Sequence, residues 1–324
     1  MQNSAFSQSV QSYRSSSPQP DSAHPDSPQP ASDIPQHPQS AQPAPSSPQR
    51  ARIGVFDSGV GGLTVLREIY RQLPNESIVY FGDTARVPYG TRSPEEILQF
   101  GREILTWMQQ QGVKMVVMAC NTSSALVLET VQAEYDFPIL GVILPGARAA
   151  VQQGKRIGVI ATPATAASNA YRQAIQEIDG TAEVWQVGCP DFVPLIEQGR
   201  LNDPETRAIA QGYLAPLLEQ QIDTLVYGCT HYPHLEPVLN TILPPTINRV
   251  DPAVHVVAAA VQELDLLGLR NPYASLPTQF YVSGNPAPFI AISKQWLGFT
   301  PIVNQVDMTQ IEVPSARPQA VSAE

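Results

Sequence analysis

From Ile53 onward the chain alternates between two kinds of segment, and this alternation restricts the possible folds more than any other feature. The first kind is a short apolar run, rich in β-branched residues and without a polar residue at every second position. Such runs suit strands that are buried on both faces, as in a parallel sheet. Longer amphipathic stretches separate them, so the pattern predicts an α/β fold with mostly parallel sheets. The runs are RIGVF, SIVYFGD, MVVMAC, FPILGVI, RIGVIA, AEVWQVG and TLVYGC.

Residues 93–112 show why helices are predicted between these runs. Ser93 suits the N-cap and Pro94 the first helical position, and two glutamates follow where the helix dipole is positive. Gly112 is placed to end the helix. The apolar residues recur at helical spacing and give one buried stripe of Ile97, Gly101, Ile104, Leu105 and Met108.

A similarity between the two halves of the sequence predicts two related α/β domains. In each half an apolar strand that contains glycine comes first, and a later strand ends in a cysteine followed by hydroxyl or amide residues. Each domain would then present one cysteine. A chance likeness between two Rossmann-like units is the alternative.

The two ends of the chain differ in composition from the rest. In residues 1–50 Pro, Ser, Gln and Ala dominate, and large aliphatic residues are almost absent. Such a segment buries too little apolar surface to offset the entropy lost on ordering, so we expect a disordered tail. A proline-rich docking motif is the functional alternative. Residues 316–324 have a similarly loose composition.

Composition and charge exclude several classes of protein. No apolar run approaches the roughly 18 residues of a membrane-spanning helix, and the first residues lack the features of a secretory signal. A net charge of −10 without a basic cluster argues against nucleic acid or an anionic membrane as a partner. Three cysteines in 324 residues do not suggest a disulfide framework, so we expect a soluble, cytoplasmic protein.

Two cysteines occupy matching positions in the two halves. Cys120 ends the run MVVMAC before a predicted helix, and Cys229 ends TLVYGC before THYPHL. Strand ends of this kind bind ligands in open α/β sheets, and a helix N-terminus there lowers a thiol pKa. Two thiols facing across a cleft suit inversion of a carbon stereocentre, since an acid and a base must act on opposite faces. Buried, inert cysteines are the structural alternative, which we expect for Cys189.

A zinc site is a second interpretation of the segment around Cys229. His231 and His234 lie close to this cysteine in the sequence. However, the chain has no C-x₂-C pair, and Cys-x-His is not a usual zinc spacing. We therefore expect no metal.

Two glycine-containing loops follow strands of the first half. DSGVGG (57–62) precedes a predicted helix, and its structural interpretation is a turn in which Asp57 or Ser58 caps that helix. It matches neither nucleotide-binding glycine motif. The functional alternative is that Asp57 accepts from a substrate ammonium or contacts a catalytic group. FGDTARVPYG (81–90) is either a plain connection or a pocket wall formed by Tyr89 and the backbone of Gly90.

Four motifs together resemble the glutamate racemases. They are DSGVGG, FGDTARVPYG, ACNTSSA and YGCTHYPHL, in this order and spacing. The resemblance covers residues 51–315, and four motifs in register are highly specific. In that family the cysteines of the CNT and GCTH motifs are the catalytic acid/base pair, which implies this role for Cys120 and Cys229.

The resemblance also implies the remaining site residues. Glu197, in PLIEQG, and His231 would assist proton movement at Cys229, and Asp57 would do so at Cys120. Leu144 stands where many members have Glu in a GVIEPG-like segment, which affects only the expected fine contacts with substrate. The residues implied to shape the substrate site are Asp57, Ser58, Tyr89, Gly90, Asn121, Thr122, Thr230 and His231.

The implied reaction is racemisation of glutamate without a cofactor. The sequence has no Schiff-base lysine motif for pyridoxal phosphate, so the site itself must stabilise the developing charge. By resemblance, Cys229 takes the proton from L-glutamate and Cys120 takes it from D-glutamate. The resemblance further implies a cytoplasmic homodimer that supplies D-glutamate for peptidoglycan.

The implied architecture is a pair of pseudo-symmetric flavodoxin-like or Rossmann-like domains with the active site in the cleft between them. The first domain comprises residues 51–143 and 251–315, and the second comprises residues 144–250. Three alternatives remain. They are a racemase for aspartate or another amino acid with the same cysteine pair, a nucleotide-binding module with DSGVGG as its phosphate loop, and a partner-binding protein with vestigial catalysis.

Overall fold

Two parallel sheets organise residues 47–313, the part of the chain that this computed structural model describes. The first sheet has the strand order β10-β9-β2-β1-β3-β4, and the second has the order β6-β5-β7-β8. All neighbouring strands pair in parallel, which confirms the predicted fold class. The strands of the first sheet are β1 (Ile53–Asp57), β2 (Ile78–Gly82), β3 (Met115–Met118), β4 (Ile139–Gly141), β9 (Gln279–Val282) and β10 (Val303–Gln305). Those of the second are β5 (Arg156–Ala161), β6 (Glu183–Gly188), β7 (Thr224–Gly228) and β8 (Asn248–Val250).

The two sheets share one topology. Strands β2-β1-β3-β4 follow the same chain order as β6-β5-β7-β8, with β3 corresponding to β7. Cys120 lies just beyond β3 and Cys229 just beyond β7. The similarity between the two halves of the sequence therefore corresponds to a structural repeat, and the two cysteines follow equivalent strands.

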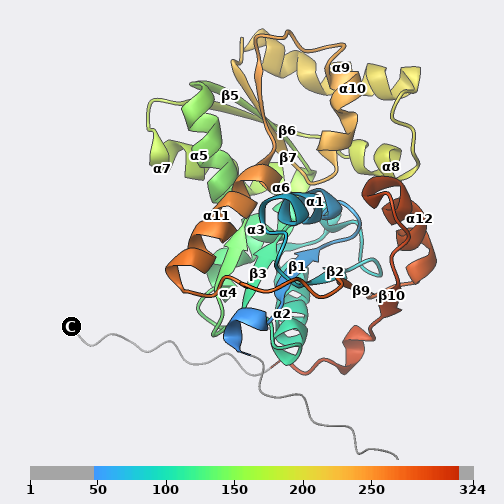
Figure 1. Cartoon of the computed structure of the whole chain (residues 1–324). Coiled ribbons are helices and arrows are strands. Elements are labelled where there is room, and N and C mark those ends of the chain that lie inside the picture. Colours follow the sequence, from blue (N-terminus) through green and yellow to red (C-terminus); the bar gives the residue numbers. More distant parts are fainter. Residues whose placement is uncertain (1–46, 314–324) are drawn as a thin grey trace, which may run out of the picture. The chain divides into compact units, whose positions relative to one another are not determined.

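Helices cover both faces of each sheet. Figure 1 shows α1 and α11 together on one face of the first sheet and α2 on the other, and separate apolar clusters fill these two interfaces. Two further clusters lie on the faces of the second sheet. The helices around the first sheet are α1 (Leu63–Gln72), α2 (Pro94–Gln110), α3 (Asn121–Leu126), α4 (Leu128–Val131), α11 (Pro252–Leu266) and α12 (Pro286–Leu297). Those around the second are α5 (Ile143–Gln153), α6 (Pro163–Ser168), α7 (Ala170–Ile178), α8 (Phe192–Glu197), α9 (Pro204–Glu219) and α10 (Glu236–Leu239). Short 3₁₀ turns are η1 (Pro48–Arg50), η2 (Tyr89–Thr91), η3 (Tyr232–Leu235) and η4 (Met308–Gln310).

Helix α2 forms as its sequence predicts. Ser93 is the N-cap and accepts from the backbone N–H of Glu96, whose side chain accepts from the N–H of Ser93 in return. This reciprocal capping satisfies two donors that the first turn leaves unpaired. Gly112, just past the end of the helix, adopts a φ of 66°, a left-handed conformation that glycine tolerates best.

Seven of the strands coincide with the seven apolar runs, whereas β8, β9 and β10 were not predicted. These three have only three or four residues each, and β10 is an edge strand with largely exposed side chains. Runs of three or four residues are too short to show a clear apolar period. The second sheet uses strands from residue 156 to residue 250, and β9 and β10 pair with the first sheet. The domain boundaries stay a prediction.

Residues 47–50 already belong to the folded part of the chain. The Gln49 side chain donates to the carbonyl of Gly268, and Lys114 Nζ donates to the carbonyl of Gln49. Lys114 also pairs with Glu76, and both side chains are almost fully buried. The predicted tail ending at residue 50 thus overlaps the fold by these residues, and its remainder, with residues 316–324, lies outside the described range. No helix within residues 47–313 is long and apolar enough to cross a membrane.

Candidate active site

The loops after β3 and β7 line one cavity of about 490 Å³. Cys120 and Cys229 both contribute to its wall, and each is almost fully buried. Ten of the eleven side chains or backbones predicted for the site line this cavity, with Asp57 directly behind the wall. The ten are Ser58, Tyr89, Gly90, Cys120, Asn121, Thr122, Glu197, Cys229, Thr230 and His231.

Cys120 lies in an environment that favours its neutral thiol. Burial and the nearby Asp57 carboxylate raise the pKa of Cys120 to about 11, and hydrogen bonding from Ser123 opposes this only partly. Cys120 is the N-cap of α3, as predicted, but that helix has only six residues. The Ser123 backbone N–H at the helix start lowers this thiol's pKa, but desolvation and the Asp57 charge outweigh it and the net shift is upward.

Cys229 lies beside a cation instead. Its Sγ is 3.7 Å from His231 Nδ1, and His231 Nε2 is 3.0 Å from Glu197 Oε1. Burial disfavours the imidazolium, yet the hydrogen bonds and charges of Cys229 and Glu197 outweigh it and raise the pKa of His231 to about 10. A protonated His231 thus places a positive charge beside the Cys229 sulfur.

The DSGVGG loop packs against the loop that carries Cys229. A Cβ on Gly61 would lie 2.3 Å from Thr230 Oγ1 and 2.4 Å from His231 Nδ1, so only glycine fits there. Asp57 Oδ2 accepts from the Gly59 N–H at 2.9 Å, and Asp57 Oδ1 accepts from the Thr230 hydroxyl at 3.4 Å. Gly61 thus allows the close approach of the two loops.

The predicted capping of α1 by Asp57 or Ser58 is wrong. The N-cap of α1 is Gly62, and no side chain caps it. Asp57 is the last residue of β1, and its carboxylate is fully buried. Because β1 is central in its sheet and ends beside β3, this carboxylate is held close to Cys120, whose pKa it raises.

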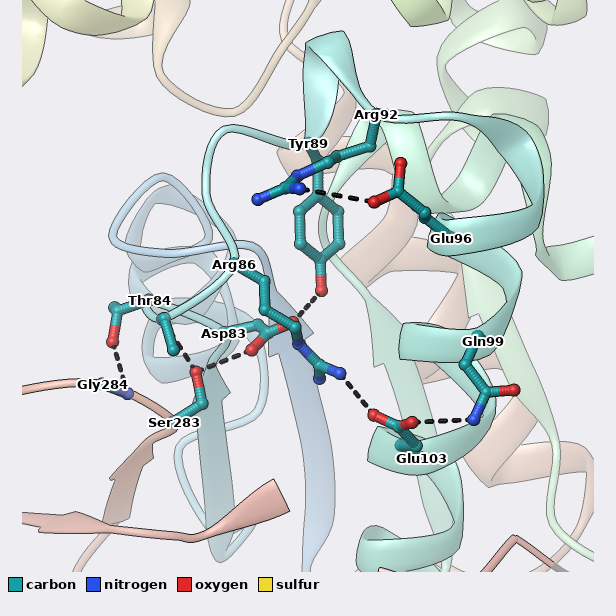
Figure 2. A network of polar contacts seen from close by, with 11 residues as sticks. Asp83, Thr84, Arg86, Tyr89, Arg92, Glu96, Gln99, Glu103, Ser283 and Gly284 are labelled. Atoms are coloured by element: carbon teal, nitrogen blue, oxygen red, sulfur yellow. Dashed lines mark hydrogen bonds and ion pairs between the residues drawn. The ribbon is translucent and has the colours of Figure 1, made fainter. Parts of the chain in front are cut away.

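The loop after β2 forms a polar network that fixes Tyr89 in the cavity wall (Figure 2). The Tyr89 hydroxyl donates to Asp83, which also accepts from Arg86 and from Ser283 of the segment after β9. Arg86 further pairs with Glu103 of α2. Since its hydroxyl is bound within this network, Tyr89 shapes the cavity by its position instead of offering the hydroxyl to a ligand.

Comparison with known proteins shows the family of this chain. The family model described as Asp/Glu/Hydantoin racemase matches residues 53–264. The glutamate racemase of Trichormus variabilis is 71% identical over 264 residues, which are 82% of this chain and 90% of that protein. The chain belongs to the Asp/Glu/Hydantoin racemase family.

Solved structures of this family have the same fold. A glutamate racemase isoform from Bacillus anthracis matches with a TM-score of 0.78 and 38% identity, over 80% of this chain and 98% of that one. The Francisella tularensis glutamate racemase, whose structure is a complex with D-glutamate, matches with a TM-score of 0.76 and 34% identity, over 80% and 98% of the two chains. Membership in this racemase family argues against the nucleotide-binding interpretation of DSGVGG.

Several cavity residues of this family member were missed by the sequence analysis. Thr162, the N-cap of α6, lines the cavity and shares its hydroxyl with Thr122 at 2.9 Å and Thr165 at 2.9 Å. A threonine followed by proline directly after an apolar run was an available signal for this helix start. Cys189 also lines the cavity, although its Sγ contacts the carbonyl of Val187 and burial raises its pKa strongly.

The two histidines of the zinc interpretation make different contacts. His234 stacks on Trp296 of α12 with ring centroids 3.7 Å apart, while His231 lies between Cys229 and Glu197. Within residues 47–313, no group of three or more His, Cys, Asp or Glu is arranged to hold a metal ion. Leu144, the departure from the family pattern, is 44% exposed on α5 and is not part of the cavity wall.

Proposed function

We propose that this chain interconverts L-glutamate and D-glutamate without a cofactor, with Cys120 and Cys229 as its two acid/base groups. The observation that carries the proposal is that two thiols, on equivalent loops of a repeated fold, line one cavity. Glutamate as the substrate is supported by 71% identity to a glutamate racemase over most of the chain.

The two thiols start in opposite protonation states. In the L-to-D direction Cys229 begins as a thiolate beside the His231 imidazolium and removes the Cα proton. Cys120 begins as a thiol, the form that burial and Asp57 favour, and gives its proton to the opposite face of the carbon. One C–H bond breaks and another forms, and the thiols end with exchanged protonation states. The D-to-L reaction starts from that state.

The developing negative charge is stabilised by neutral donors and one cation. Asn121, Thr122 and Thr230 line the cavity beside the two cysteines and are placed to donate to the substrate carboxylate. Among the described residues of the cavity wall, His231 is the only side chain that carries a positive charge at neutral pH. Glu197 orients His231, and no described wall residue is a lysine that would hold pyridoxal phosphate.

We also propose that two domains enclose the cavity. Residues 51–143 with 251–315 form one domain and residues 144–250 the other, and closure of the cleft excludes water around the thiols. We further propose a cytoplasmic homodimer whose product enters peptidoglycan synthesis, following the family resemblance.

The test is incubation of the purified chain with L-glutamate in D₂O without added pyridoxal phosphate. We expect D-glutamate that carries deuterium at Cα, detected by chiral chromatography and mass spectrometry. Folded protein that gives neither exchange nor inversion with any amino acid would contradict an enzymatic role and favour a partner-binding protein.

L-aspartate is the matched control substrate, because it differs from L-glutamate by one methylene. We expect turnover of aspartate to be lower by roughly 10-fold or more, since one missing methylene is worth about 10–200-fold in a fitted pocket. Faster turnover of aspartate would assign the chain to the alternative substrate.

A further inference from the structure

Tyr171 is a fully buried residue of α7 whose hydroxyl reaches toward the other sheet. It donates to Asn121 Oδ1 at 2.7 Å. Helix α7 packs on the second sheet with α5, whereas Asn121 directly follows Cys120 after β3 of the first sheet. This hydrogen bond therefore links the second sheet's layer to the loop that carries one of the two thiols.

The hydrogen bond fixes which way the Asn121 amide points. An amide side chain has one accepting oxygen and one donating NH₂ group. Because Oδ1 accepts from Tyr171, the NH₂ group is directed elsewhere, and no protein acceptor for Nδ2 is found within residues 47–313. Asn121 lines the cavity. Its NH₂ group is thus the donor available to a substrate carboxylate.

The Tyr171 ring is held where the chain passes between the two sheets. The chain leaves the first sheet through α5 and returns through Pro252 at the start of α11. A Cβ on Gly146 of α5 would lie 3.0 Å from Pro252 Cγ and 3.3 Å from Tyr171 Cε1. The two crossings and the tyrosine ring are therefore in close contact at one point, which only a very small residue at position 146 allows.

The Tyr171 phenol stays protonated and therefore remains a donor. Burial is the main cause that raises the pKa of Tyr171 well above its ordinary value, and nearby acidic groups add to it. The O–H bond that holds the Asn121 oxygen therefore persists at neutral and moderately alkaline pH.

We propose that Tyr171 is a positioning residue for the racemase reaction: it turns the Asn121 amide so that its NH₂ group faces the substrate carboxylate, and it ties that orientation to the crossing between the two sheets. This inference rests on the proposed function. It assigns a role to a residue of the second domain that does not itself line the cavity.

The test is a double-mutant cycle of Tyr171→Phe and Asn121→Ala, measured as kcat/KM for racemisation. We expect Tyr171→Phe to lower kcat/KM about tenfold, the effect of losing one buried hydrogen bond that orients a donor to a charged group. In the Asn121→Ala background, Tyr171→Phe should have no further effect. An unchanged kcat/KM, or the same fractional loss in both backgrounds, would overturn the proposal.

Two further variants distinguish a positioning role of Tyr171 from a purely structural one. Tyr227→Phe removes another buried hydroxyl, which donates to Glu236 away from the cavity wall, and should match Tyr171→Phe in Tm while retaining wild-type kcat/KM. Asn121→Asp keeps an oxygen for Tyr171 but replaces the NH₂ donor, so it should lose more than tenfold in kcat/KM. Wild-type activity in Asn121→Asp would contradict the orientation. If the wild-type chain showed no racemisation, that result would contradict the proposed function itself.

Discussion

The loops that carry Cys120 and Cys229 occupy equivalent places in a repeated fold, yet they surround their thiols with opposite charges. Cys120 lies near the buried Asp57 carboxylate, and its pKa is raised to about 11. Cys229 contacts His231, whose pKa is raised to about 10 by Cys229 and Glu197 despite burial. The strand topology around the two loops is the same, and the electrostatic surroundings are not.

The difference shows how a structural repeat can serve a reaction that needs two unlike groups. Inversion through two bases requires one thiol and one thiolate at the start of each turnover. A strictly symmetric site would leave both sulfurs equally protonated. Here an anion lies near Cys120 and a cation lies beside Cys229, so the two sulfurs have the unlike surroundings that the proposed scheme requires.

The largest effects on racemisation are expected when either thiol is removed. We expect Cys120→Ala and Cys229→Ala each to lower racemisation about a thousandfold, within the range of lost general acid/base catalysis. The remaining thiol should still exchange one enantiomer's Cα proton in D₂O: Cys120→Ala that of L-glutamate, and Cys229→Ala that of D-glutamate. Proton NMR of each enantiomer measures this. Near-wild-type racemisation by either variant would rule out the two-thiol scheme.

Removal of the cation should have the next largest effect. In His231→Asn the Cys229 thiolate loses its charged partner, so fewer molecules hold the form that binds L-glutamate. We expect kcat/KM to fall about 30-fold in both directions, because the equilibrium constant of a racemisation is one. KM should rise more for L-glutamate than for D-glutamate. Equal changes in the two KM values would show that His231 does not distinguish the two sides.

The charge of His231 beside Cys229 also predicts an alkaline limit to activity. His231 is protonated below its pKa of about 10 and loses its charge as the pH rises through that value. We expect the L-to-D rate to decline near pH 10 in the wild type. In His231→Asn the decline should move upward, toward the pKa of about 11 of Cys120. A pH profile of kcat on both proteins tests this, and identical profiles would contradict it.

The free energy of unfolding should also depend on the charge of His231. The pKa of His231 rises from 6.5 to about 10 on folding, so its contribution to the free energy of unfolding is fully present below pH 6.5 and is lost as the pH rises through 10. The Tm difference between wild type and His231→Asn should therefore narrow from pH 6.5 to pH 10 in thermal unfolding. A constant difference would indicate that His231 gains no proton on folding.

The smallest effect is expected for the third cysteine. Cys189 lies in the cavity wall, but neither an imidazole nor a carboxylate side chain bonds its sulfur among the described residues. Cys189→Ala should change kcat/KM by less than about threefold, as for a small volume change in a wall. A large loss with unchanged Tm would extend the comparison to three functional sulfurs.

Much of the site was predictable because its residues come directly after strands with a strong apolar signal. The ends of β1, β2, β3 and β7 carry nearly all the predicted cavity residues. What was missed lies on elements with weak local signals or acts across the fold. Strand β10 is three residues long, and the partners Tyr171 and Asn121 are fifty positions apart.

The alternation of apolar runs and amphipathic stretches determined the α/β fold, since periodicity depends on neighbours a few residues apart. The motifs around the two cysteines determined which strand ends bear the site. Only the tertiary structure decided the charge at each thiol. Asp57 lies close enough to Cys120 to raise its pKa, and Glu197 hydrogen-bonds His231, because separate strands and helices pack together. A pKa depends on burial and on charges a few ångströms away in space, and sequence distance does not fix either of them.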